Sequence, residues 1–352
     1  MLSNPEAPKM RAAVHAGIRS LEMVEVDRPS VLPGTALVRV AVAGVCGSDL
    51  HGYHSQAERQ TRQDGHELSG VVVKVGEGVA NVRVGDRVAA DILTIGRGCG
   101  TCHYCRSGNH LHCEGARVPC TGAFAEYTLA GAAGCFHLPE GLDHSLGALV
   151  EPVAVGVHAV RFARIEPSDS VTIIGGGTIG LCTLLAARWI GCERVFVAAR
   201  HPFQAEAARR LGAAAVLPAE AKATTEAVRS LTDGRGADHV VEAVGGGGDT
   251  IDLAVQLARR QGRVAILGLF THGPVAVNAM EALERELTVT FPLCYSVIDG
   301  RHDFEVAIDL IAAWPALARS LITHEFPLDD VATAFATAAD KRSGAIKVQV
   351  RP

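Results

Sequence analysis

Residues 171–180 read VTIIGGGTIG, and this stretch decides the fold of a large part of the chain. A short apolar run is followed at once by glycines and then by a segment with helical spacing. In a strand–turn–helix unit, glycines let the backbone approach a pyrophosphate, which then lies at the amino end of the helix. We therefore expect a dinucleotide to bind this turn rather than a glycine-rich turn without a ligand. The expected contacts are Gly175, Gly177, Thr178, Ile179 and Gly180.

Further strands and helices alternate on the carboxyl-terminal side of this turn. Arg194–Ala198, His239–Glu242 and Arg263–Leu267 have the apolar composition of buried strands. Helical spacing is found in Gly180–Ile190 and Phe203–Leu211. Strands that alternate with helices in this way are typical of an α/β fold with a doubly wound parallel sheet.

The first 150 residues have a different pattern, with short strands and many turns. Ala36–Ala43, Gly70–Val75 and Val82–Ala90 are apolar-rich runs separated by glycines, and no long helical period interrupts them. This part of the chain therefore predicts a separate, β-rich domain.

Bulk properties set the class of protein. The chain has 352 residues, of which 48% are hydrophobic and 20% charged, so two soluble domains are expected. A formal charge of −5 argues against a nucleic-acid or membrane-surface partner. No apolar run is long enough to span a bilayer, and no signal-peptide pattern is found near Met1. We therefore expect a cytoplasmic protein.

Four cysteines lie close together in GCGTCHYCRSGNHLHC, residues 98–113, with the spacing C-x2-C-x2-C-x7-C. Four thiolates in one short lobe can enclose a tetrahedral zinc ion and leave no open position, which predicts a structural site. An iron–sulfur cluster is the alternative, but the seven-residue gap and the lack of a following proline disfavour it. The three histidines in the lobe are expected to be exposed. The predicted ligands are Cys99, Cys102, Cys105 and Cys113.

A second set of metal-binding residue types is dispersed along the chain. Cys46 lies in GVCGSDLH, His66 and Glu67 in DGHELSG, and Glu151 in LVEPVAVGVHAV. One thiolate, one imidazole and one carboxylate suit a catalytic zinc ion that keeps a position open for substrate. Each residue alone is weak evidence, and only their combination with the cysteine lobe and the nucleotide-binding pattern makes the prediction.

These motifs together resemble the medium-chain zinc-dependent alcohol dehydrogenase family, and within it the polyol branch of sorbitol, butanediol and threonine dehydrogenases. The resemblance extends over nearly the whole chain and includes VGEGV and VGDRV at 75–79 and 84–88. It implies a GroES-like catalytic domain over residues 1–154, with a zinc lobe at 96–115. A Rossmann domain is expected over 155–294, and residues 295–352 are expected to complete the catalytic domain.

The resemblance also assigns roles to single residues. Cys46 and His66 are expected to bind the catalytic zinc, with either Glu67 or Glu151 as a further ligand and Asp49 supporting them. Ser48 corresponds to the hydroxyl that takes the alcohol proton, and His51 to the far end of that relay. The implied reaction is hydride transfer between a secondary alcohol, such as a polyol, sugar or amino alcohol, and NAD(P). The expected catalytic residues are Ser48, His51, Glu67 and Glu151.

The choice of cofactor depends on the end of the second Rossmann strand. NAD-binding members usually place an acidic residue there, whereas this chain has Ala199, followed by Arg200 and His201. A neutral residue beside a guanidinium favours the 2′-phosphate of NADP, although NAD remains an alternative if Arg200 stacks on the adenine or points to solvent. Lys347 corresponds to a basic residue near the cofactor phosphates, with an exposed strand lysine as the alternative.

Two features leave the substrate open. Arg62, Gln63 and Asp64 precede the GHE motif where the family has apolar residues, and the loop from His54 to Gln60 is also unusual. A biosynthetic NADPH-dependent carbonyl reductase and a non-catalytic zinc- and nucleotide-binding protein remain alternatives. A homodimer or homotetramer is expected, because Leu287–Phe291 lies where the family pairs subunits edge to edge, although the same run could simply be the last strand of the Rossmann sheet.

Overall fold

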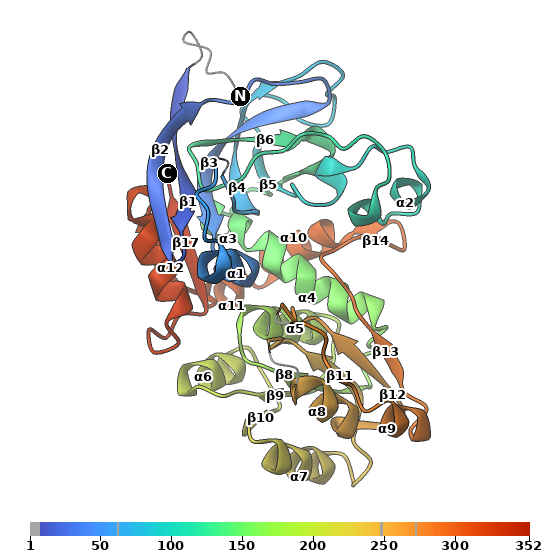
Figure 1. Cartoon of the computed structure of the whole chain (residues 1–352). Helices are drawn as coiled ribbons and strands as arrows, with labels where there is room; N and C mark the ends of the chain where they lie inside the picture. Colours follow the sequence, from blue (N-terminus) through green and yellow to red (C-terminus); the bar gives the residue numbers. More distant parts are fainter. Residues whose placement is uncertain (1–7, 62, 247–248, 272) are drawn as a thin grey trace. The chain divides into compact units, whose positions relative to one another are not determined.

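The computed structural model describes residues 8–61, 63–246, 249–271 and 273–352 (Figure 1). The chain divides into two compact units, one made of Met1–Glu151 with Asp299–Pro352 and the other of Pro152–Ile298. We call them the catalytic unit and the nucleotide unit. The boundary expected at residue 154 lies within helix α4 (Val150–Phe162), so the chain passes from one unit into the next inside a helix.

The nucleotide unit contains, within the described residues, a six-stranded sheet in the order β10-β9-β8-β11-β12-β13, and the pairings between neighbours are parallel. The order reverses beside β8, which is the kind of position where such sheets bind ligands. The strands are β8 (Ser170–Ile174), β9 (Arg194–Ala198), β10 (Ala215–Leu217), β11 (Ala237–Glu242), β12 (Ala258–Ile266) and β13 (Thr288–Thr290). Its helices, besides most of α4, are α5 (Thr178–Trp189), α6 (Pro202–Arg210), α7 (Ala221–Leu231), α8 (Asp249–Leu257) and α9 (Ala279–Glu284), and β14 (Val297–Ile298) ends the unit.

The register of this sheet brings several loops to one edge. Ile174 pairs with Ala198 of β9 and with Glu242 of β11, so these three strands end at the same level. All five residues of β8 are buried, as expected for a central strand covered on both faces. The expected doubly wound α/β fold is confirmed, with β9 at its predicted bounds. Strand β12 begins before the expected Arg263, because Ala258 already pairs with Ala237 of β11.

The catalytic unit contains a mixed sheet in the order β16-β17-β3-β4-β5-β7, with β6 paired to β3, and a separate β1–β2 hairpin (Figure 1). Its strands are β1 (Lys9–Gly17), β2 (Ser20–Asp27), β3 (Thr35–Gly44), β4 (Glu67–Val75), β5 (Arg87–Ala90), β6 (Tyr127–Gly131), β7 (Cys135–His137), β15 (Arg301–His302), β16 (Ile322–Pro327) and β17 (Lys347–Arg351). Its helices are α1 (Gly47–Ser55), α2 (His103–Arg106), α3 (His144–Ala148), α10 (Asp303–Ala313), α11 (Pro315–Arg319) and α12 (Val331–Ala339). Short 3-10 helices are η1 (Ile95–Arg97), η2 (His110–His112), η3 (Ala132–Gly134) and η4 (Leu328–Asp330).

One expected strand of this unit is shorter than predicted. The apolar run Val82–Ala90 forms a strand only from Arg87, because the chain turns before it. Gly85 has a φ of +95°, and the carboxylate of Asp86 accepts a hydrogen bond of 2.8 Å from the backbone N–H of Arg83. A turn stabilised in this way ends the extended conformation at the positions where alternation alone predicted a strand.

Among the described residues, no helix is both long and apolar enough to cross a membrane.

Candidate zinc centres and cofactor loop

The four cysteines predicted to bind a structural zinc ion come together in the catalytic unit. Their sulfur atoms all lie within 4.8 Å of one another, and Cys99 Sγ lies 3.9 Å from Cys105 Sγ. Two thiolates on one tetrahedral zinc ion, with Zn–S bonds of about 2.3 Å, are roughly 3.8 Å apart. A disulfide would need about 2.05 Å, and all four cysteines are free. The donor set therefore fits zinc.

Backbone N–H groups in this lobe point at the sulfur atoms. The N–H groups of Cys99 and Cys102 donate to Cys113 Sγ at 3.3 Å and to Cys99 Sγ at 3.4 Å. The hydroxyl and backbone N–H of Thr101, together with the N–H of Cys102, lower the pKa of Cys99 to about 5. Donors of this kind stabilise the thiolate, which is the form that binds metal.

Burial has the opposite effect deeper in the lobe, where it raises the pKa of Cys105 to about 12. A cation beside Cys105 would offset that effect and keep the sulfur as a thiolate. Space for the cluster depends on Gly115, since a Cβ there would lie 2.6 Å from Cys99 Sγ. His103 and His112 are exposed as expected, whereas His110 is half-buried, because its side chain packs closely against Gly98, where a Cβ would lie 3.0 Å from His110 Cδ2.

The dispersed residues are placed by three elements of the catalytic unit. Cys46 follows β3 and caps the amino end of α1, and His66 lies directly before β4. Strands β3 and β4 are antiparallel, with Gly44 opposite Glu67, so Cys46 and His66 are neighbours. Glu151 lies in the first turn of α4 and is buried. The fold therefore gathers residues that are far apart in the sequence.

Asp49 connects two of the predicted ligands. Its Oδ2 accepts a hydrogen bond of 2.8 Å from the backbone N–H of Cys46, and its Oδ1 lies 3.7 Å from His66 Nδ1. A carboxylate on that side of the imidazole orients the ring and leaves Nε2 available to a metal. Asp49 thus has the supporting position that the resemblance implied for it.

Burial and neighbouring charges shift the pKa values of the acids and of the histidine in this site. Burial raises the pKa of Glu151 to about 8, against the effect of His66, and Glu67 raises it further. Burial likewise raises the pKa of Asp49 to about 6. Burial alone would lower the pKa of His66, but Asp49, Cys46 and Glu151 raise it well above its usual value. Several buried acids around one thiol and one imidazole are a donor set that a divalent zinc ion fits.

Glu67 has a partner within the protein. Lys347 Nζ donates to both carboxylate oxygens of Glu67, at 2.6 and 2.7 Å, and to the carbonyl oxygen of Val45 at 2.9 Å. Both side chains are buried, with 2% of Lys347 and none of Glu67 exposed. A Cβ at position 44 would lie 2.0 Å from Glu67 Oε2, so Gly44 makes room for the carboxylate. The alternative of an exposed strand lysine at Lys347 is therefore wrong.

The two residues expected to move the alcohol proton lie on α1. Ser48 and His51 are three residues apart, so they share one face of the helix, and both are half-buried. In the described part of the chain, only the four-cysteine lobe has three or more ligand atoms within 4.8 Å of one another. The dispersed set is therefore looser than the lobe.

In the nucleotide unit, the glycine turn has the geometry that its sequence predicted. Gly175 has a φ of +107°, and Gly177 caps the amino end of α5. A Cβ on Gly180 would lie 1.9 Å from the carbonyl oxygen of Gly175, so only glycine lets the helix pack this closely. Thr178 and Ile179 form the first turn of α5 and are half-buried.

The residues expected to select the cofactor lie beside this turn. A Cβ on Gly176 would be 3.2 Å from the Cβ of Ala199, which places Ala199 next to the glycines. Arg200 is exposed, and within the described residues its side chain has no ion pair or hydrogen bond. His201 caps the amino end of α6 and stacks on Phe203, with ring centroids 5.5 Å apart.

Sequence reasoning missed one buried residue that shapes the loops near this edge of the sheet. Glu242 ends β11 fully buried, and its Oε1 accepts hydrogen bonds of 2.8 Å from the N–H groups of Val244 and Gly245. Oε1 also accepts a hydrogen bond of 2.9 Å from the Thr250 hydroxyl, and Oε2 accepts one of 3.2 Å from the N–H of Gly268. A lone glutamate at the end of an apolar strand, followed by glycines, is the signal that could have identified it.

Comparisons with known proteins agree with this geometry. Residues 32–140 match the alcohol dehydrogenase GroES-like domain, and residues 178–313 match the zinc-binding dehydrogenase domain. Sorbitol dehydrogenase from Halalkalibacterium halodurans is 32% identical over 93% of this chain and 94% of its own length. The chain belongs to the medium-chain zinc-dependent alcohol dehydrogenase family.

Other members of this family are similar over their full length. Sorbitol dehydrogenase from Bacillus subtilis is 28% identical over 97% of both chains. A structure from Sinorhizobium meliloti, described as a zinc-binding dehydrogenase bound to NADP, has a TM-score of 0.84 and 29% identity, over 98% of this chain and all of that chain. The predicted polyol-type, zinc-dependent oxidoreductase that uses a nicotinamide cofactor is thereby confirmed.

Proposed function

We propose that this enzyme oxidises the secondary alcohol of a polyol-like substrate with NADP, or reduces the matching ketone with NADPH, using one catalytic and one structural zinc ion. The observation that carries the proposal is the link from the Cys46 backbone through the Asp49 carboxylate to the His66 ring. The names of the similar enzymes, which include two sorbitol dehydrogenases, support the substrate class.

We assign Cys46, His66 and Glu151 as the catalytic ligands. Glu151 is preferred over Glu67, because both oxygens of Glu67 already accept hydrogen bonds from Lys347. The raised pKa of Glu151, about 8, comes from burial, and a bound cation would reverse it. When bound, zinc supplies a Lewis acid that polarises the reacting oxygen of the substrate.

We assign the transfer of the alcohol proton to two side chains of α1. The Ser48 hydroxyl takes the proton that the alcohol loses, and His51, one turn further along the same face, passes it on. Glu67 and Lys347 neutralise each other and keep a buried charge pair beside the ligands. The expected contact of Lys347 with the cofactor phosphates stays a prediction, and the three acceptors that its ammonium already has within the protein disfavour it.

The proposed preference for NADP rests on Ala199 and Arg200. Ala199 has no carboxylate to repel a 2′-phosphate, and the exposed, unpaired guanidinium of Arg200 can donate to it. Ala199→Asp together with Arg200→Ala should shift the ratio of kcat/KM values toward NAD by about 10- to 100-fold, since charge-assisted hydrogen bonds contribute about 1.5–3 kcal/mol. A wild-type enzyme that already favours NAD would contradict the proposal.

The assembly proposed from the sequence is a homodimer or homotetramer. Strand β13 is at an edge of the nucleotide-unit sheet, and the side chains of Phe291 and Leu293 just beyond it are 65% and 53% exposed. Exposed apolar residues beside an unpaired edge suit the pairing of two subunits. A cytoplasmic location also stays a prediction.

The decisive experiment is a cofactor-reduction screen with the purified protein. Polyols, sugars and amino alcohols are supplied with NADP or NAD, and their ketones with NADPH, while absorbance at the nicotinamide band is recorded. Turnover of a polyol by the wild type, lost in Cys46→Ser, supports the proposal. Reduction of ketones without measurable oxidation of any alcohol would favour the biosynthetic carbonyl reductase instead.

A further inference from the structure

A cavity of about 760 Å³ lies in the nucleotide unit, away from the glycine turn. Its wall includes Gly236 and Leu257, which immediately precede strands β11 and β12. The glycine turn follows the carboxyl end of β8, and β8 runs parallel to β11. The cavity is therefore at the amino edge of the sheet, and none of the expected zinc, catalytic or cofactor residues lines it. Cavities of roughly 300–1,000 Å³ hold small-molecule ligands.

The wall of this cavity is rich in arginine. Five arginines and two glutamates line it, and two of the arginines are neutralised by carboxylates. Arg259 Nε lies 2.6 Å from Asp238 Oδ1, and Arg285 Nη2 lies 2.7 Å from Glu281 Oε1. These two pairs leave three guanidinium groups and the Glu284 carboxylate as the remaining charged groups of the wall.

Three guanidinium groups keep their positive charge. Arg260 Nη1 donates to the backbone carbonyl oxygen of Glu284 at 3.0 Å, which leaves the charge uncompensated. Arg235 lies 3.4 Å from Asp233, but both side chains are mostly exposed, so the pair contributes little. Arg229 on α7 has no ion pair or side-chain hydrogen bond with any described residue. Guanidinium groups bind phosphate through paired, charge-assisted hydrogen bonds.

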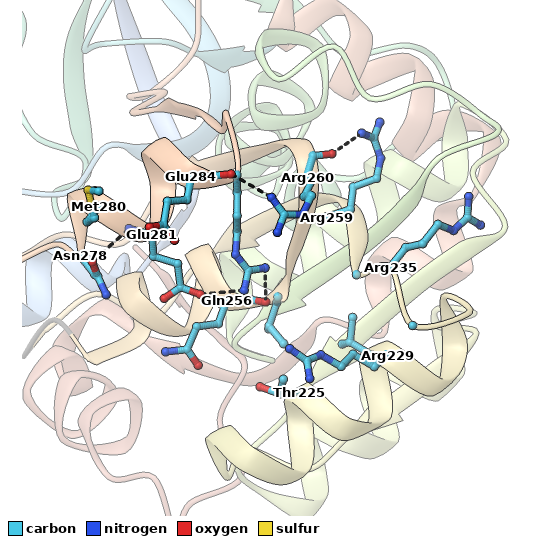
Figure 2. Close-up of a pocket in the computed structure, with 15 residues that line it drawn as sticks. Thr225, Arg229, Arg235, Gln256, Arg259, Arg260, Asn278, Met280, Glu281 and Glu284 are labelled. Atoms are coloured by element: carbon cyan, nitrogen blue, oxygen red, sulfur yellow. Dashed lines mark hydrogen bonds and ion pairs between the residues drawn. The ribbon is translucent and has the colours of Figure 1, made fainter.

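The opposite wall carries carboxylate and amide groups. Figure 2 shows Asn278, Glu281 and Glu284 on one side of the cavity and Arg229 and Arg235 on the other. The Glu284 carboxylate has no ion pair within the described residues, and the side-chain NH₂ of Asn278 has no acceptor there. Carboxylate and amide groups of this kind bind the hydroxyl groups of sugars.

We propose that this cavity binds a sugar phosphate, with the phosphate against Arg229 and Arg235 and the hydroxyl groups against Glu284 and Asn278. A neutral sugar would leave the three guanidinium charges without a counter-charge. Inorganic phosphate would leave Glu284 and Asn278, on the opposite wall, without a hydrogen-bonding partner. A molecule that carries both groups matches both walls, at the edge of the sheet opposite the glycine turn.

Isothermal titration calorimetry of the full-length, zinc-loaded enzyme with glucose 6-phosphate tests the proposal. We expect saturable binding that Arg229→Ala/Arg235→Ala weakens at least 10-fold. The control is Arg210→Ala, an exposed arginine of α6 that does not line the cavity, and its affinity should equal that of the wild type. Thermal unfolding of each variant verifies that it is folded.

A second variant keeps the proposal testable if the double variant does not fold. Glu284→Ala should weaken the binding of glucose 6-phosphate several-fold, because the sugar contacts that wall, and should leave the affinity for inorganic phosphate unchanged or higher, because a negative charge is removed from the cavity. The proposal is overturned by the absence of saturable binding, by equal affinity for inorganic phosphate, by loss of binding when NADP saturates the enzyme, or by unchanged binding in both variants.

Discussion

The two candidate zinc centres of the catalytic unit are built in opposite ways. The cysteine lobe takes its ligands from one short stretch, Cys99 to Cys113, and backbone N–H groups of the same stretch point at the sulfur atoms. The dispersed site takes Cys46, His66 and Glu151 from separate elements, and the sheet brings them together. A local site contributes to the stability of its own loop, whereas the dispersed site depends on the folding of the elements that place its ligands, which are α1, β4 and α4.

The largest expected effect tests whether the dispersed site is the catalytic one. Cys46→Ser removes a ligand from the dispersed site, so kcat should fall about 1,000-fold or more, since a Lewis acid is worth several kcal/mol in the transition state. Zinc content should fall from two ions per chain to one, and the thermal midpoint should change little. Elemental analysis and steady-state kinetics measure these outcomes. Wild-type turnover in this variant would rule out the catalytic assignment of Cys46.

The second prediction tests whether the cysteine lobe binds a zinc ion that stabilises the fold. Cys102→Ala removes a ligand from the closed lobe, where metal binding contributes directly to folding. We expect the loss of one zinc ion, a clearly lower thermal midpoint and rapid proteolysis within residues 96–115. Because Cys120 lies outside the ligand set, Cys120→Ala is the control and should keep both zinc ions. Equal stability of the Cys102→Ala variant and the wild type would contradict a structural role.

A third prediction concerns the support of the dispersed site. Lys347→Gln leaves the fully buried Glu67 without its cation, and breaking a buried pair costs about 3–5 kcal/mol of unfolding free energy. Lys9→Gln removes the partly exposed pair with Asp27 and should cost about 1 kcal/mol or less. Urea denaturation compares the two. Adding Glu67→Gln to Lys347→Gln should recover much of the loss, and a failure to do so would show that Lys347 stabilises the fold by another route.

The smallest effect distinguishes ligands from their supports. Asp49→Asn keeps the shape of the side chain but removes the charge beside His66, so activity or zinc affinity should fall about 10- to 100-fold. Asp233→Asn, at a mostly exposed carboxylate, should leave both unchanged. Zinc titration with a competing chelator measures the affinity. A loss as large as that of Cys46→Ser would mean that Asp49 is itself a ligand.

The same contrast explains what the sequence could predict. The cysteine lobe and the glycine turn were found because spacing within a few residues specifies their geometry, and β8, β9 and α5 followed from hydrophobic periodicity. The pair of Glu67 and Lys347 was not found, because 280 residues separate them and only the pairing of strands β3, β4 and β17 brings them together. The role of Glu242 was missed for a related reason, since its carboxylate oxygens accept hydrogen bonds from loops that follow two different strands.

The order in which the two centres are completed follows from the positions of Cys113 and Lys347 along the sequence. On a ribosome, the cysteine lobe has all its ligands once Cys113 has been made, and it can take up metal while the chain up to Lys347 is synthesised, over roughly ten seconds to just under a minute. Glu67 is made before the lobe but receives its counter-charge only when Lys347 has been made. Translation that stops short of β17 therefore leaves a chain whose lobe has all its ligands, while Glu67 lacks its cation and is costly to bury.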